Sequence, residues 1–156
     1  MEIVTVKNKK GDKFLRRGTS LFDFKKYTKK EVRELVKTMR QAMHAAAGIG
    51  LSANQIGMDI SVFVAKVDNK FYAVFNPEIS QSSKETVEMD EGCLSVPGVY
   101  GIVTRPEKIT LKGFDPAGKL LKIKAWGLLA RVFQHEVDHL RGGLFIDKAK
   151  NLQKIN

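Results

Sequence analysis

Two histidines four residues apart constrain the fold of this chain more than any other feature. Residues 135–139 have the sequence H-E-V-D-H, and they lie in a stretch where apolar residues recur every three or four positions. This periodicity predicts a helix over 127–141. Because residues i and i+4 lie one above the other on a helix, the imidazoles of His135 and His139 can both point at a single metal ion. Glu136, offset by about 100° on the helix, can then reach a water molecule on that ion without binding the ion.

A catalytic metal site of this kind needs a third protein ligand and an open position for water. The chain has a single cysteine, Cys93, and one further histidine, His44. A lone cysteine is ordinarily a small buried hydrophobic residue. Here, however, Cys93 follows a predicted strand, and a thiolate is a strong ligand for Fe(II), Zn(II), Ni(II) or Co(II). We therefore take Cys93 as the third ligand, and we interpret His44 as an exposed side chain.

Local signals predict an α+β fold with mostly antiparallel sheets packed around the metal-binding helix. One N-terminal helix is expected over 28–47, because Thr28 and Glu31 have the spacing of a capping box and Gly48 is placed to end the helix. Runs rich in β-branched and aromatic residues predict the strands. The expected strands are 60–67, 71–75, 84–89, 102–104, 107–114 and 119–124.

Length and composition indicate one globular domain over residues 1–156. The chain is 43% hydrophobic and 28% charged, and it shows neither a membrane-spanning run nor an N-terminal targeting pattern. We expect a cytoplasmic protein without membrane association. The net charge of +10 favours association with a polyanion, and the ribosome is a candidate. The absence of any nucleic-acid-binding motif argues against sequence-specific binding to DNA or RNA.

Three segments together resemble peptide deformylases. Residues 48–55 (G-I-G-L-S-A-N-Q) resemble that family's G-x-G-L-A-A-x-Q motif. Residues 91–95 (E-G-C-L-S) and 134–140 (Q-H-E-V-D-H-L) match its E-G-C-L-S and Q-H-E-x-D-H-L motifs. The three occur in the family's order, and the resemblance spans residues 28–147. It implies a metal-dependent hydrolase that removes the formyl group from the N-terminal methionine of newly synthesised polypeptides, through attack of metal-activated water on the formyl carbonyl.

The resemblance also assigns the metal ligands and the proton-transfer group. Cys93, His135 and His139 would hold one divalent ion, expected to be Fe(II), with Zn(II), Ni(II) or Co(II) able to replace it. Glu136 would accept a proton from the attacking water and then pass one to the leaving amine.

Four more residues receive roles by the same resemblance. The Gln55 amide and the Leu94 backbone N–H would stabilise the oxyanion of the tetrahedral intermediate. Ile49 and Gly50 would lie along the nascent N-formylmethionyl peptide, which would add to the sheet as a further strand. A hydrophobic pocket would take the methionine side chain.

The chain departs from the family pattern at Ser52, which stands where the motif has alanine. Serine is small, so we expect this change to be tolerated and to allow an added hydrogen bond. The segment 14–19 lacks the proline common after the early Leu-Arg of relatives, and the C-terminus lacks the long helix of some bacterial members. We also expect an ion pair between Asp138 and Arg105, because an inward-pointing acidic residue within the ligand pentapeptide needs a partner.

Two other functions were weighed. A zincin-like peptidase shares the H-E-x-x-H sequence, but it takes its third ligand downstream, where this chain offers only Asp147. Cleavage of internal peptide bonds would identify such an enzyme. A non-catalytic basic binding protein with a relict site is disfavoured because the three ligands and Glu136 are all present; RNA binding without hydrolysis would identify it.

Overall fold

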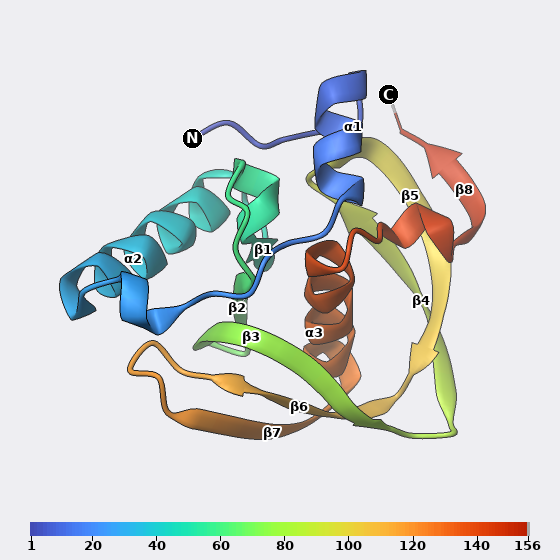
Figure 1. Cartoon of the computed structure of the whole chain (residues 1–156). Helices are drawn as coiled ribbons and strands as arrows, with labels where there is room; N and C mark the ends of the chain where they lie inside the picture. Colours follow the sequence, from blue (N-terminus) through green and yellow to red (C-terminus); the bar gives the residue numbers. More distant parts are fainter. Residues whose placement is uncertain (156) are drawn as a thin grey trace.

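The computed structural model describes residues 1–155, which contain three α-helices and eight strands (Figure 1). The helices are α1 (Lys9–Arg16), α2 (Lys29–Ala45) and α3 (Gly127–Leu140). The strands are β1 (Gly50–Ser52), β2 (Val62–Val67), β3 (Lys70–Ser82), β4 (Thr86–Cys93), β5 (Val96–Pro106), β6 (Lys108–Phe114), β7 (Leu120–Trp126) and β8 (Lys150–Lys154). Among these residues no helix is both long and apolar enough to cross a membrane.

The strands form two antiparallel sheets, and α3 lies between them (Figure 1). The larger sheet has the order β1-β2-β3-β6-β7, and the smaller has the order β4-β5-β8. The prediction of an α+β fold with antiparallel sheets around the helix that carries the histidines is confirmed. Because both sheets are tied to the same helix, the arrangement supports our proposal that residues 1–156 form one domain.

The larger sheet is apolar on both faces, and β2 shows why. Successive side chains of a strand point to opposite faces. Phe63 and Ala65 therefore pack with α3, while Val62 and Val64 pack with α2 on the other side. Both helices are thus held against one sheet by hydrophobic burial, the main favourable term in folding.

Helix α2 begins as the sequence predicts and ends differently. The Thr28 hydroxyl accepts from the Glu31 N–H at 3.1 Å, and the Glu31 carboxylate accepts from the Thr28 N–H at 3.3 Å, which completes the capping box. The left-handed residue after the helix is Ala47, with φ of 54°, and not Gly48. Gly48 instead lies where an added Cβ would come within 3.0 Å of the Leu94 side chain.

The expectation of a single N-terminal helix is wrong, because α1 precedes α2. Asn8 caps α1 by accepting from the Gly11 N–H at 2.8 Å, and Arg16 at its end bonds Asp147 at 2.6 Å. Leu15 is the only large apolar side chain that α1 buries. Such a polar helix lacks the apolar periodicity that reveals an amphipathic one.

Several strand boundaries also needed correction. The segment predicted as 102–104 belongs to the eleven-residue β5, and the segment predicted as 84–89 is β4, which continues to Cys93. These strands pair with each other along most of their length. Exposed polar residues in β4, and Pro97 and Gly98 in β5, interrupt the apolar pattern that predicts a strand. β1 and β8 were not predicted, because one has three residues and the other is exposed throughout.

The end of α2 gives a prediction about stability. A left-handed residue with a Cβ is strained, so Ala47→Gly should raise the free energy of unfolding by about 0.5–1 kcal/mol after the extra chain entropy of glycine is counted. Ala46→Gly is the matched control, because Ala46 has a φ of −89° and gains nothing from glycine. Urea unfolding of both variants measures the effect. An equal loss of stability in the two would contradict it.

Candidate metal centre

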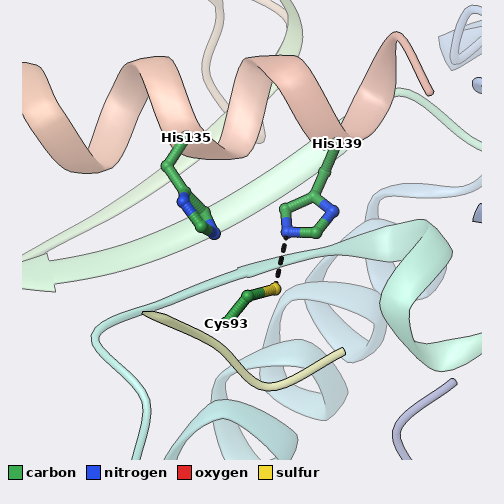
Figure 2. A group of neighbouring side chains, drawn as sticks. All are labelled: Cys93, His135 and His139. Atoms are coloured by element: carbon green, nitrogen blue, oxygen red, sulfur yellow. Dashed lines mark hydrogen bonds between the residues drawn. The ribbon is translucent and has the colours of Figure 1, made fainter. Parts of the chain in front are cut away.

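The three predicted ligands converge at the inner face of α3 (Figure 2). His135 and His139 lie one helical turn apart, with ring centroids separated by 4.9 Å. Cys93 is the last residue of β4, and its Sγ lies 3.1 Å from Nε2 of His139. One donor atom from each of the three lies within 4.8 Å of the others. The structure thus brings together residues that are 46 positions apart in the chain.

These donors fit a divalent transition metal. Thiolate and imidazole ligands at ordinary bond lengths around a tetrahedral ion are separated from one another by about 3.5 Å. Burial and the neighbouring His135 lower the pKa of His139 well below its usual value. That favours the neutral imidazole that metal binding requires.

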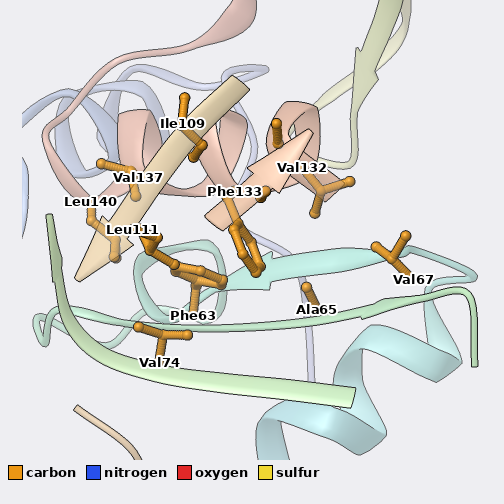
Figure 3. Close-up of a cluster of buried hydrophobic side chains, with 12 residues drawn as sticks. Phe63, Ala65, Val67, Val74, Ile109, Leu111, Val132, Phe133, Val137 and Leu140 are labelled. Atoms are coloured by element: carbon orange, nitrogen blue, oxygen red, sulfur yellow. The ribbon is translucent and has the colours of Figure 1, made fainter. Parts of the chain in front are cut away.

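The opposite face of α3 fixes the rotation of the helix (Figure 3). Phe133 and Val137 are buried in the hydrophobic cluster shared with β2, β3 and β6. Phe133 packs against Phe63 and Tyr72, with ring centroids 5.6 and 5.2 Å away. Any rotation that moved the histidines would expose these side chains, so hydrophobic packing sets the direction in which the ligands point.

A buried carboxylate, that of Glu91, orients His135. Its Oε1 accepts from Nδ1 of His135 at 2.8 Å, which leaves Nε2 of the ring for the ion. Arg105 donates to both carboxylate oxygens at 2.6 and 3.0 Å, and Arg131 donates at 2.8 Å. Burial raises the pKa of Glu91, but the hydrogen bonds and charges of His135 and Arg105 outweigh burial and hold the pKa below its usual range.

Glu91 and Arg131 were not among the predicted site residues, although the spacing of each from a predicted ligand is regular. Glu91 lies two residues before Cys93 in the same strand, so the two side chains share a face. Arg131 lies four residues before His135 in the same helix. The predicted ion pair is confirmed, since Arg105 Nη1 lies 2.8 Å from Oδ2 of Asp138.

Glu136 is buried beside the ligands. Burial raises the pKa of its carboxyl, while His135 and a hydrogen bond from Ser52 oppose that rise. The Ser52 hydroxyl lies 2.6 Å from Oε2 of Glu136. On the other side, a Cβ added to Gly50 would lie only 2.5 Å from Oε1, so a glycine leaves the space that this carboxyl occupies.

Gln55 is anchored close to Cys93 by both ends of its amide. Its Oε1 accepts from the Ser52 N–H at 3.0 Å, and its Nε2 donates to the Ser95 hydroxyl at 3.1 Å. The separation of 3.6 Å between Nε2 and Cys93 Sγ is a weaker contact. Because its amide is held at both ends, Gln55 presents a fixed donor next to Cys93.

One cavity of about 490 Å³ is lined by all the predicted site residues except His139. Its walls include Ile49, Gly50, Gln55, Cys93, Leu94, His135 and Glu136. His139 contacts Cys93 without lining the cavity, while His44 lies apart on the exposed surface of α2. A substrate in this cavity would meet Cys93 and His135 together with the Glu136 carboxyl and the Gln55 amide.

The Glu91 network gives a prediction with a pH dependence. Glu91→Gln leaves the buried Arg131 without its carboxylate partner and Arg105 with Asp138 alone, which should cost about 3 kcal/mol of unfolding free energy at pH 7. Because the folded-state pKa of Glu91 is lowered, its stabilisation is complete above the unfolded value and is lost as pH falls. The difference between parent and variant should therefore shrink below about pH 4.5.

Urea unfolding at pH 7 and pH 4 measures this difference. Glu88→Gln is the matched control on the same strand, since Glu88 is exposed and pairs only with Lys150 on the surface, where ion pairs contribute little. A Glu91→Gln variant as stable as this control would contradict the account.

Comparison with known proteins agrees with the site. The model of the polypeptide deformylase family matches residues 1–155. The peptide deformylase of Pelotomaculum thermopropionicum is 46% identical over 122 residues, which cover 78% of each chain.

Two solved structures share the fold. A peptide deformylase from Synechococcus elongatus, in complex with actinonin, has a TM-score of 0.87 and 34% identity, over 97% of this chain and 79% of that one. The peptide deformylase from Thermotoga maritima has a TM-score of 0.86 and 33% identity, over 96% and 97%. The chain therefore belongs to the polypeptide deformylase family, and it is a metal-dependent hydrolase that removes the N-formyl group from newly made polypeptides.

Proposed function

We propose that Cys93, His135 and His139 hold one divalent ion and that Glu136 moves the protons when the formyl group leaves an N-terminal methionine. The observation that carries this proposal is the convergence of three metal-ligating side chains beside a cavity that Cys93, His135 and the buried carboxylate Glu136 line. The ion, when bound, would supply Lewis-acid activation of water and of the formyl carbonyl. Proton transfer and stabilisation of the developing negative charge would come from side chains and the backbone of the protein.

The peptide has a place to bind along β1, which is an edge strand of the larger sheet. The carbonyl of Ile49 accepts from the Lys66 N–H at 2.9 Å, and Gly50 pairs with Ala65 one position further. In an antiparallel pair, hydrogen-bonded and non-hydrogen-bonded positions alternate. The N–H and C=O of Gly50 therefore point away from β2, where an extended peptide can add as a new strand. Ile49, half-exposed at the cavity rim, would contact its side chains.

Glu136 is placed for proton transfer, and Gln55 and Leu94 for charge stabilisation. We propose that Glu136 accepts the proton of the attacking water and later gives a proton to the leaving amine. Nε2 of Gln55 and the backbone N–H of Leu94, next to Cys93 in the chain, would donate to the developing negative oxygen. The positions of Gln55 and Leu94 support these two roles, since both residues line the cavity with Cys93.

We propose Fe(II) as the bound ion, with Zn(II), Ni(II) or Co(II) able to replace it. One thiolate and two imidazoles suit all four ions. Metal analysis of protein purified without oxygen identifies the ion directly.

A peptidase of the zincin type is disfavoured by the third ligand. Cys93 reaches the histidines from β4, upstream of α3, and no acidic or histidine side chain downstream joins the three in the part of the chain described. The match to the polypeptide deformylase family also disfavours a zincin-type peptidase.

We also propose that the enzyme works in the cytoplasm and associates with the ribosome through a basic surface. The support is the substrate, which is a newly made polypeptide, and the net charge of +10, which attracts polyanions. Sedimentation with ribosomes at low and high salt tests this association.

The role of Glu136 gives a direct prediction. Glu136→Gln keeps the size of the side chain but cannot accept a proton, so kcat for a formyl-Met peptide should fall by about 10²–10⁴-fold. The variant should still bind one equivalent of metal, because Glu136 is not a ligand. Formate release and metal content measured on the same sample check both statements. A variant with its metal and full activity would exclude this role.

Gly50 gives a second prediction. Gly50→Ala places a methyl group 2.5 Å from Oε1 of Glu136 and 3.1 Å from Val132, so the carboxyl must move. We expect kcat to fall at least tenfold. Gly57→Asn is the control, because a Cβ added there meets nothing within 4 Å and asparagine is the non-glycine residue that best tolerates a left-handed φ such as +82°. Equal activity in the two variants would show that Gly50 does not keep space for Glu136.

A further inference from the structure

Ser52, where this chain departs from the family motif, directly contacts the carboxyl group of Glu136. It ends β1, and its side chain is fully buried. The Ser52 Oγ lies 2.6 Å from Oε2 of Glu136 and 3.1 Å from the main-chain oxygen of the same residue. The alanine of the family motif could make neither contact.

The three oxygen atoms can be satisfied in two ways without moving. A serine hydroxyl has one proton to donate and lone pairs to accept. When Glu136 is ionised, the hydroxyl donates to Oε2. When Oε2 carries a proton, it can donate to the hydroxyl, which turns its own proton to the main-chain oxygen at 3.1 Å. Rotation about the C–O bond of Ser52 is the only change needed.

Because these oxygen atoms are buried, the hydrogen bond from Ser52 matters for the position of the Glu136 carboxyl. A buried polar atom that loses its partner costs free energy, because no water replaces the lost hydrogen bond. The other oxygen, Oε1, lies against Gly50, where there is no room for a side chain. Oε2 is thus held by Ser52, while Oε1 occupies the space that Gly50 leaves free.

We propose that Ser52 is a positioning residue whose hydroxyl holds the Glu136 carboxyl in one place, both ionised and protonated, throughout the reaction. This inference rests on the proposed role of Glu136 in proton transfer. No proton leaves the group of three oxygens through Ser52, since its hydroxyl only reorients. The backbone N–H of Ser52 separately holds Gln55 at 3.0 Å, and a change of the side chain leaves that bond in place.

The test compares Ser52→Ala and Ser52→Thr with the parent, all with metal content verified. We expect Ser52→Ala to lower kcat for a formyl-Met peptide roughly tenfold, the loss of one hydrogen bond to a charged group, with KM changed less than twofold. Ser52→Thr keeps the hydroxyl and should recover most of kcat. Ser61→Ala is the matched control, because Ser61 is a buried serine outside the cavity and should leave both constants unchanged.

Crystal structures supply a readout independent of activity. The Glu136 carboxyl should keep its place in the parent and in Ser52→Thr, and should move or adopt several rotamers in Ser52→Ala. Parent kcat together with an unmoved carboxyl in Ser52→Ala would overturn the proposal. A raised KM at constant kcat would also overturn it, since Ser52 would then act on substrate binding. Either result leaves the proposed function intact, whereas full activity in metal-loaded Glu136→Gln would remove the role of Glu136 itself.

Discussion

The geometry of the candidate metal site depends on one buried carboxylate, that of Glu91, which joins α3 to the smaller sheet. It binds Arg105 from β5 and Arg131 and His135 from α3. Its own strand, β4, ends two residues later at Cys93. One group therefore forms ion pairs with two buried arginines, and it orients His135 from the strand that ends at Cys93. A charge buried at such a point is tolerated only when its hydrogen bonds are complete.

Hydrophobic packing supplies the other half of the positioning. Helix α3 is held on the larger sheet by Phe133 and Val137 (Figure 3), so its polar face can turn only toward Cys93 and the cavity. The same sheet ends at β1, whose open edge borders that cavity. The fold thus places a strand edge suited to an extended peptide beside the three side chains that we propose as metal ligands. The three proposed ligands alone would suit many hydrolases. The open edge of β1 beside them is the feature that fits an extended peptide.

Much of the site could be predicted because its residues lie in short segments with regular geometry. The spacing of His135 and His139 on a helix needs no tertiary information, and the motif around Cys93 supplied the third ligand. Local pattern could not reveal α1, which buries little besides Leu15, or β8, which depends on pairing with β5. The bond between Ser52 and Glu136 joins residues 84 positions apart, so only the folded chain shows it.

The most direct test is formate release from a formyl-Met peptide by protein purified without oxygen, before and after removal of its metal and after reloading with Fe(II) or Ni(II). We expect activity from protein with one ion per chain, loss of activity with the metal, and recovery on reloading. Replacement of Cys93 by alanine should abolish both the bound ion and the activity. Full metal occupancy without formate release, or formate release that survives metal removal, would contradict the account.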